Sequence, residues 1–282
     1  IHNTTNYKVP LKIGVCPIPR YNPALSLSLY IDRANIAKKY TSARNTNYIC
    51  YFTDDMNKKL NMKNMIESEM VRALSKSEFV VYYQPKYELA NDTIIGAEAL
   101  VRWNHKEKGI ISPGVFIPVF ERNGFIVDLD FYVYEQVLKM QKHRLDMGKK
   151  VIPISMNVSR CHLSDTNFVD KLEAVVAKYK VPKQYIEMEI TESIFSQEDS
   201  SAIALIYNLK EHGFTISMDD FGSGYSSLNL LRKVPIDTLK IDKVFIDSTE
   251  DVQRSQVIVE EIINMASKIH VKTICEGVET QS

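Results

Sequence analysis

Residues 93–103 read Thr-Ile-Ile-Gly-Ala-Glu-Ala-Leu-Val-Arg-Trp, and this stretch decides the fold. β-Branched and aliphatic residues dominate it, which predicts a strand. The period-2 alternation of a strand places Glu98, Leu100 and Arg102 on one face and small or apolar residues on the other. A buried carboxylate in so apolar a strand needs a cation or hydrogen-bond donors, because a lone buried charge is costly. Taken alone, Glu98 fits an ion pair with Arg102 as well as it fits a functional site.

Strands and helices alternate from Glu78 onward. Strands are predicted over residues 79–83, 93–103, 151–158, 185–190, 214–218, 238–241 and 271–275, with helical stretches between most of them. Strands alternating with helices of this length imply parallel pairing through crossovers. The fold is therefore α/β, either a doubly wound sheet or a (β/α) barrel.

The polarity of the later strands distinguishes these two folds. A sheet covered by helices on both faces would be apolar on both sides. Here one face of each strand becomes polar toward its C-terminal end, in the pairs Ser155 and Asn157, Glu187 and Glu189, Ser217 and Asp219, and Thr238 and Lys240. This pattern favours a barrel interior with a polar mouth at the C-terminal strand ends.

The first part of the chain predicts a separate, smaller unit. Residues 1–58 fit part of an α/β unit with strands over 11–16 and 48–52 and a helix over 26–39. A helix from about residue 56 to 75 follows, with apolar residues near helical spacing. Residues 59–77 are interpreted as a connecting helix before a barrel over 78–282, although a simple first helix of the second domain is the alternative.

The composition limits the class of protein. Lys plus Arg balance Asp plus Glu at 35 each, so no net charge attracts the chain to a nucleic acid polymer or an acidic membrane. The four cysteines lie far apart, which indicates reduced thiols and a cytoplasmic location. No stretch approaches the roughly 18 apolar residues of a membrane span. Because the chain begins at Ile1, an upstream sensory or membrane domain is left open.

Polar residues at the strand ends are expected to meet at one mouth of the barrel. They are Glu98, Asn157, Glu189, Asp219, Asp220, Lys240 and Glu276, with Glu192 and Glu279 just beyond two strand ends. Clustered carboxylates repel one another unless cations lie among them. The ligands are oxygen donors, with no His or Cys at a strand end, so Mg²⁺ or Mn²⁺ is predicted. Two such ions suit hydrolysis of a phosphate ester, with Lys240 steadying the phosphoryl charge or holding the water.

Other interpretations of these residues stay open at this point. A glutamate at a strand end can cap a helix, and Lys240 can pair with Asp242. Glu189 and Glu276 could also serve as acid and nucleophile of a glycosidase. The surplus of acids, the central lysine and the single tryptophan argue against that activity. A binding module without catalysis is the third class.

The chain resembles the EAL-domain cyclic di-GMP phosphodiesterases over about residues 78–282. The matching motifs are Gln84-Pro85, Glu98-Ala99-Leu100-Val101-Arg102-Trp103, Ile111-Ser112-Pro113, Phe116-Ile117-Pro118, Asn157-Val158-Ser159, Glu189-Ile190-Thr191-Glu192, the run from Asp219 to Leu228, Leu239-Lys240-Ile241-Asp242 and Glu276-Gly277-Val278-Glu279-Thr280. The resemblance implies a modified (β/α)8, TIM-like barrel whose first strand is antiparallel. It also implies cleavage of cyclic di-GMP to linear pGpG and a homodimer formed through the barrel.

The resemblance further implies a role for each matching residue. The metal ligands would be Glu98, Asn157, Glu189 and Asp219, with Asp220 serving a second metal. Lys240 and Glu276 would position or activate the attacking water, so that the catalytic set is Glu276, Lys240, Glu98 and Asp220. The dinucleotide would contact Gln84, Leu100, Arg102 and Glu279. Glu192 would anchor the loop after Asp220. A silent cyclic di-GMP receptor is the alternative, but receptors of this family lose metal ligands and this chain keeps them.

The sequence departs from the family pattern at both ends. The family continues to a further strand with a Gln-Gly signature, whereas this chain stops at Ser282, so we expect a longer native protein. Residues 1–58 resemble the C-terminal half of a GGDEF (diguanylate cyclase) domain in Lys12-Ile13-Gly14, Asp32-Arg33-Ala34 and Asp54-Asp55-Met56. The signature of that domain is absent, so no cyclase activity is predicted.

Overall fold

The chain forms two compact units, Ile1–Val71 and Arg72–Ser282. The computed structural model describes residues 11–18, 26–41, 48–195, 200–222, 228–245 and 252–278. The division between the units falls within the long helix α2 (Asp54–Ser75). In the described part of the chain, no helix is both long enough and apolar enough to cross a membrane.

The first unit pairs two short parallel strands, β1 (Ile13–Val15) and β2 (Ile49–Tyr51), through the helix α1 (Leu27–Lys39). Gly14 lets α1 approach β1, because a Cβ at this position would collide with the Ala34 carbonyl oxygen. Asp54 and Asp55 in the first turn of α2 stabilise its positive N-terminal end. The elements predicted over 11–16, 26–39 and 48–52 are confirmed.

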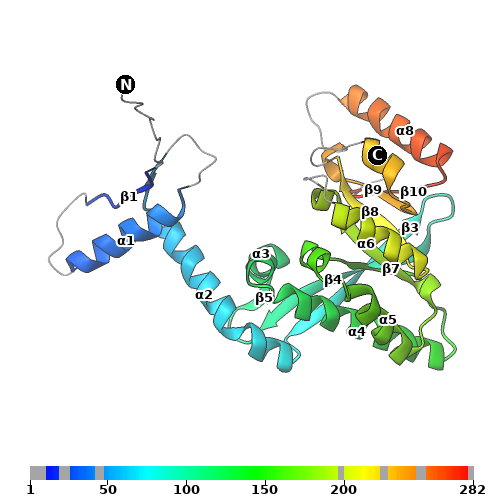
Figure 1. The fold of residues 1–282 in the computed structure, drawn as a ribbon, viewed down its shortest axis with the longest axis horizontal. Coiled ribbons are helices and arrows are strands. Elements are labelled where there is room, and N and C mark those ends of the chain that lie inside the picture. Colours follow the sequence, from blue (N-terminus) through cyan, green and yellow to red (C-terminus); the bar gives the residue numbers. More distant parts are fainter. Residues whose placement is uncertain are drawn as a thin grey trace, which may run out of the picture. The chain divides into compact units, whose positions relative to one another are not determined.

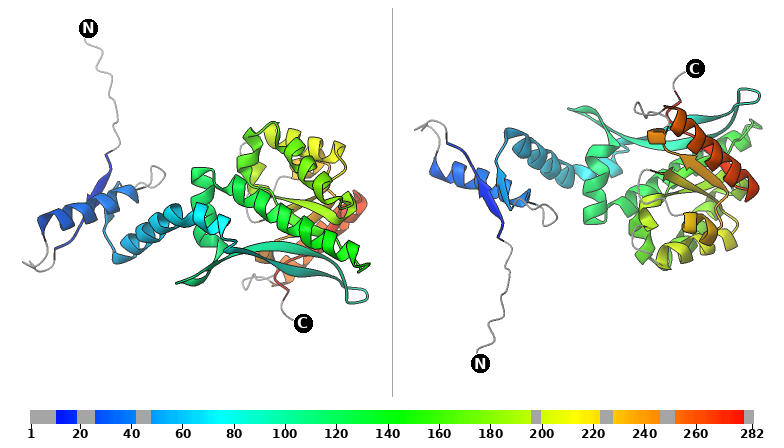
Figure 2. Two further views of the ribbon diagram at one scale, coloured as in Figure 1. Left: turned by 90° about the horizontal axis from the view of Figure 1, so that it is seen from below. Right: turned by 90° about the horizontal axis from the view of Figure 1, so that it is seen from above.

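The second unit is built on one curled sheet (Figure 1). Its strands are β3 (Phe79–Glu88), β4 (Thr93–His105), β5 (Gly109–Ile111), β6 (Ile154–Asn157), β7 (Ile186–Thr191), β8 (Thr215–Phe221), β9 (Thr238–Ile241) and β10 (Lys272–Cys275). They lie in the order β10-β9-β8-β7-β6-β4-β3, with β5 paired to β4. β3 pairs with β4 in the antiparallel direction, and the strands from β4 to β10 in this order are parallel. The reversed first strand is therefore confirmed, and the long β3–β4 hairpin forms one side of the unit (Figure 2).

Helices connect successive strands of this sheet. The α-helices are α3 (Pro113–Asn123), α4 (Ile126–Asp146), α5 (Phe168–Tyr179), α6 (Ser200–Glu211), α7 (Leu228–Lys233) and α8 (Val252–Lys268). Four 3-10 helices are described, η1 (Arg160–Ser164), η2 (Lys183–Tyr185), η3 (Glu192–Phe195) and η4 (Lys243–Phe245). Gly124, with a φ of 83°, ends α3 in the left-handed conformation that favours glycine.

The apolar faces of the strands form the core beneath these helices. Met156, Met188 and Met218 are buried in one cluster with side chains of α4, α5 and α6. The alternate residues carry polar groups on the concave side of the sheet, where the Lys86 ammonium on β3 lies 3.1 Å from Glu187 Oε2 on β7. β3 and β7 are not neighbours in the sheet, so this ion pair spans the interior. The predicted TIM-like α/β fold is confirmed in the form of a curled, half-barrel sheet, with its apolar face under the helices and polar groups on its concave side.

Candidate functional site

Lys240 on β9 lies at the centre of a carboxylate cluster on the concave side of the sheet. Its ammonium lies 3.0 Å from Glu98 Oε2, 2.9 Å from Asp219 Oδ1 and 2.7 Å from Glu276 Oε1. It also contacts Glu189 Oε1. The acids come from β4, β7, β8 and the residue after β10, so the curl of the sheet brings them together. Only 2% of the Lys240 side chain is exposed, so water screens these charges weakly.

Glu189 needs more positive charge than this lysine supplies. Its side chain is fully buried, and its oxygens find no hydrogen-bond donor in the described residues beyond the ion pair with Lys240. A buried carboxylate in that state is unfavourable unless a cation completes its surroundings. Asn157, opposite Glu189 in the strand pairing, donates from Nδ2 to Glu98 Oε1 at 3.4 Å. The Asn157 amide group therefore lies next to Glu98 at the edge of the cluster.

The two adjacent aspartates at the end of β8 have raised pKa values. Burial, followed by the charges of Glu276, Asp220 and Glu98, raises the pKa of Asp219 to about 8, despite the Lys240 ammonium beside it. Burial and the carboxyl group of Asp242 also raise the pKa of Asp220. Sequence reasoning considered Asp242 only as a partner of Lys240. Its contact with Asp220 instead makes it a further acid at this site.

The donor set fits divalent cations. Carboxylate oxygens of Glu98, Glu189 and Glu276 lie within 4.8 Å of one another, and so do those of Asp219, Asp220 and Glu276. Oxygen atoms at this spacing, with an unsatisfied buried carboxylate among them, suit hard ions such as Mg²⁺ or Mn²⁺. The arrangement is therefore an acidic cluster with the spacing to hold metal ions, and Glu276 belongs to both groups.

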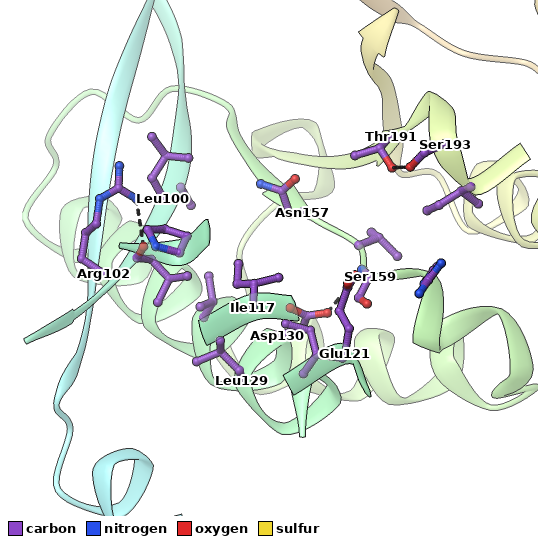
Figure 3. Close-up of a pocket in the computed structure, with 18 residues that line it drawn as sticks. Leu100, Arg102, Ile117, Glu121, Leu129, Asp130, Asn157, Ser159, Thr191 and Ser193 are labelled. Carbon is purple, nitrogen blue, oxygen red and sulfur yellow. Dashed lines mark hydrogen bonds between the residues drawn. The ribbon is translucent and has the colours of Figure 1, made fainter. Parts of the chain in front are cut away.

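A pocket of 260 Å³ lies beside the cluster (Figure 3). Leu100 and Arg102 from β4 and Asn157 from β6 line it. The Arg102 guanidinium donates to the Val101 carbonyl oxygen at 2.9 Å, whereas Glu98 pairs with Lys240. The alternative ion pair between Glu98 and Arg102 is thus not the one formed. The pocket reaches the cluster at Asn157 and combines apolar side chains with the charged Arg102, Glu121 and Asp130.

The remaining predicted residues have distinct places. Gln84 on β3 is paired opposite Glu98, on the same face of the hairpin. Glu192 accepts a hydrogen bond of 2.9 Å from the Gly222 backbone N–H and so holds the segment directly after Asp220. Glu279 lies outside the described residues.

Curated proteins with related sequences include bacterial cyclic di-GMP phosphodiesterases. The chain is 30% identical over 249 residues to the bifunctional diguanylate cyclase/cyclic di-GMP phosphodiesterase MucR of Pseudomonas aeruginosa. The aligned region covers 88% of this chain and 36% of MucR. It is 32% identical over 250 residues to the cyclic di-GMP phosphodiesterase NbdA of the same organism, covering 89% of this chain and 32% of NbdA. The chain thus spans about a third of the length of these relatives.

Solved structures share the fold of the second unit. The MucR phosphodiesterase in complex with c-di-GMP matches with a TM-score of 0.72 and 32% identity, over 77% of this chain and 88% of that one. The EAL enzyme Bd1971 bound to cAMP and cyclic di-GMP matches with a TM-score of 0.72 and 31% identity, over 81% of this chain and 62% of that one. Both similarities support the barrel-type fold described above.

A family model extends the match through the site. The model described as the EAL domain matches residues 67–282, which include every predicted site residue. With the reversed first strand, the acidic cluster around Lys240 and the adjoining pocket in place, the chain belongs to the EAL domain family.

Proposed function

We propose that this chain hydrolyses one phosphodiester bond of cyclic di-GMP to give linear pGpG. The acidic cluster carries the proposal, because five carboxyl groups lie close together around one ammonium, and burial and mutual repulsion raise the pKa values of Asp219 and Asp220. Two divalent cations would supply the opposite charge. The names of the relatives MucR and NbdA and the c-di-GMP complex of MucR support this substrate.

In this proposal the cations are Mg²⁺ or Mn²⁺, and the residues of the cluster hold them. The ligands are Glu98, Asn157, Glu189 and Asp219, with Asp220 serving the second ion. When bound, the ions neutralise phosphate charge and lower the pKa of a water molecule. Glu98 and Asp220, as charged ligands, also set the charge of the site during the reaction.

Glu276 and Lys240 act on the attacking water and on the reacting phosphate. Glu276 is the most exposed of the acids around Lys240, at 31%, so its carboxylate can accept a proton from water at the opening of the site. Lys240 lies 2.7 Å from Glu276 and holds that carboxylate in place. Its fixed positive charge also stabilises the negative charge that develops on the phosphoryl oxygens.

Gln84, Leu100 and Arg102 would hold the dinucleotide. Leu100 offers apolar surface to a base, and the Arg102 guanidinium can pair with a phosphate oxygen. Glu192 would fix the segment after Asp220 through its bond to Gly222. The contact of Glu279 with the substrate remains a prediction from the family motif.

Three further assignments stay predictions, two from the sequence resemblance and one from the cysteine content. The first is that residues 1–58 are related to a GGDEF domain, followed by a connector over 59–77 and the barrel over 78–282. The second is homodimerisation through the barrel. The third is a cytoplasmic location of this portion. The four free cysteine thiols agree with a reducing location. The description of MucR as a bifunctional diguanylate cyclase and phosphodiesterase supports a GGDEF assignment.

Incubation of the purified protein with cyclic di-GMP tests the proposed activity. We expect linear pGpG with Mg²⁺ or Mn²⁺, no product after chelation, and no product from Glu98→Ala, whose side chain contributes a ligand. Calorimetry measures binding of the dinucleotide in parallel. Tight binding with no product at any metal concentration would contradict hydrolysis and identify a receptor.

A further inference from the structure

We propose that Asp130 and Tyr134, one turn apart on α4, are positioning residues that fix the end of β6 and thereby aim the Asn157 amide at the carboxylate cluster. The inference rests on the proposed function only in treating Asn157 as a metal ligand. Neither residue belongs to the cluster itself, and neither was identified from the sequence.

Tyr134 completes the hydrogen bonding of β6 where its pairing with β4 ends. β4 pairs with β6 at Ala97 with Ile154 and at Glu98 with Ser155. Two residues later, the fully buried Tyr134 hydroxyl donates to the Asn157 carbonyl oxygen at 2.9 Å. This bond replaces the missing strand partner and fixes the orientation of the Asn157 peptide. The Asn157 side chain then points toward Glu98, where Nδ2 lies 3.4 Å from Oε1.

Asp130 holds the next part of the same segment. Its Oδ2 accepts hydrogen bonds from the Ser159 backbone N–H at 3.3 Å and from His162 Nε2 at 2.9 Å. The Nδ1 atom of His162 is buried without a hydrogen-bond partner in the described part of the chain, so the ring is held through Nε2 by its contact with Asp130. The His162 ring also packs against Phe168, with 4.2 Å between ring centroids. These contacts hold Asp130 in one orientation.

The two contacts act on either side of Val158. Tyr134 fixes the peptide at Asn157, and Asp130 fixes the peptide at Ser159. Ser159 also lines the pocket, as Asp130 does (Figure 3). Loss of either bond would let the Asn157 amide turn away from the cluster. The cost would then appear in the affinity for cations, since groups that orient a ligand tune metal binding.

A matched pair of tyrosine variants tests the role of Tyr134. Tyr134→Phe removes only the hydroxyl group. Tyr132→Phe removes a similar hydroxyl on the same helix, which donates to the Phe79 carbonyl oxygen at 3.0 Å on β3. We expect Mn²⁺ binding, measured by calorimetry on the metal-free full chain, to weaken about tenfold in Tyr134→Phe and to change less than about twofold in Tyr132→Phe.

A second pair tests Asp130. Asp130→Ala removes the acceptor for the Ser159 N–H, whereas Asp130→Asn keeps an oxygen at the same place. We expect Mn²⁺ binding to weaken in Asp130→Ala and to be largely restored in Asp130→Asn. Circular dichroism establishes that each variant is folded at the temperature of the titration. If Asp130→Ala is unfolded there, the two tyrosine variants decide alone.

The outcomes separate this inference from the proposed function. If folded Tyr134→Phe binds Mn²⁺ as tightly as the wild type does, the positioning role is overturned, even if the wild type hydrolyses cyclic di-GMP. Weakened Mn²⁺ binding in Tyr134→Phe, with no hydrolysis by the wild type, would uphold the positioning role and reject the proposed activity. Equal weakening in Tyr134→Phe and Tyr132→Phe would indicate a general packing effect and would also overturn the role.

Discussion

The Lys240 ammonium contacts acids from four other parts of the chain, which makes it the residue on which the site's charge depends most. Buried ion pairs of this kind contribute little net stability, because desolvation offsets the attraction. A lysine held among acids is instead suited to stabilising charge that develops during a reaction. We therefore expect Lys240 to affect catalysis and not substrate binding.

Replacement of Lys240 by Met tests that separation. Lys240→Met keeps most of the side-chain volume and removes the charge. We expect kcat for cyclic di-GMP hydrolysis to fall by about 100-fold or more, with KM changed by less than about threefold, because in the proposed mechanism the ammonium acts at the reacting phosphate. Steady-state kinetics and calorimetry measure the two effects.

Lys86→Met is the matched control for Lys240→Met. Lys86 is also an interior lysine paired with a glutamate, but its partner Glu187 is not one of the clustered acids. We expect this variant to lose stability while its folded fraction keeps kcat close to that of the wild type. A similar loss of kcat in both variants would argue against a specific role of Lys240.

The sequence predicted the acids of the site but not the residues that we propose to position Asn157 beside them. Glu98, Glu189 and Asp219 could be identified because strand periodicity places them on one face and at one end of the barrel. Asp130 and Tyr134 lie in an amphipathic helix, where nothing in the sequence distinguishes them from ordinary buried positions. Their importance follows from the distance between α4 and β6, which periodicity does not provide.

At the scale of elements, the end of β8 is held in an unusual backbone conformation. Asp220 has a φ of 56°, although it is not glycine, and Gly222 has a φ of 97°. Strained backbone of this kind occurs where a functional group must be aimed. A Cβ on Gly222 would overlap the ring of Phe245 in η4. Glycine is therefore required here for space as well as for backbone conformation.

Gly222→Ala should displace Asp220 and impair turnover. Because misplacement by about 1 Å can cost about 100-fold in rate, we expect a loss of kcat of that order. Gly109→Ala is the control, since Gly109 also has a positive φ, 68°, but has open space around it. Kinetic assays of both variants measure the effect. Equal activities of the two variants would mean that a Cβ at position 222 does not displace Asp220.

A second element-scale feature is the connection between the end of α2 and β4. Glu78 accepts hydrogen bonds from Arg72 Nη1 at 2.6 Å and from Trp103 Nε1 at 3.1 Å. Burial raises the pKa of Glu78, but the bonds from Trp103 and Arg72 outweigh burial, so the pKa lies below its ordinary 4.5. A carboxylate with a lowered pKa stabilises the folded state at pH values above its ordinary pKa. This stability is lost as the pH falls through the lowered pKa.

Glu78→Gln should therefore destabilise the protein in a pH-dependent way. We expect a lower midpoint of urea unfolding at pH 7 and a smaller difference from the wild type as the pH falls below the lowered pKa. Glu67→Gln in α2 is the control, because its pair with Lys63 is partly exposed to water, at 36% and 37%, and contributes little. A destabilisation by Glu78→Gln that is the same at all pH values would contradict the role of the charge.

Most elements could be predicted from the sequence, and their ends could not. The strand predicted over 79–83 continues to Glu88, because the antiparallel partner β4 supplies hydrogen bonds beyond the apolar residues. The short strand β5 and the four 3-10 helices were not predicted, since segments of three to five residues show no periodicity. These differences leave the positions of the clustered acids unchanged.

At the scale of the whole molecule, the chain divides into two units, and the proposed chemistry lies entirely in the second. A fragment of residues 54–282 keeps all of α2 and removes most of the first unit. We expect it to fold and to hydrolyse cyclic di-GMP with a kcat/KM within about threefold of the full chain, as separate domains generally do. A fragment that binds Mn²⁺ but does not turn over would show that the first unit is needed for activity.

The most direct test of the whole account is the position of cations in a crystal grown with Mn²⁺. Anomalous scattering locates manganese independently of the surrounding atoms. We expect two peaks between the strand ends, one near Glu98, Asn157, Glu189 and Asp219 and one near Asp220. The proposed metal site, and the chemistry built on it, would be contradicted by the following result. Mn²⁺ peaks appear elsewhere in the crystal, none lies at these side chains, and Lys240 still contacts all four acids.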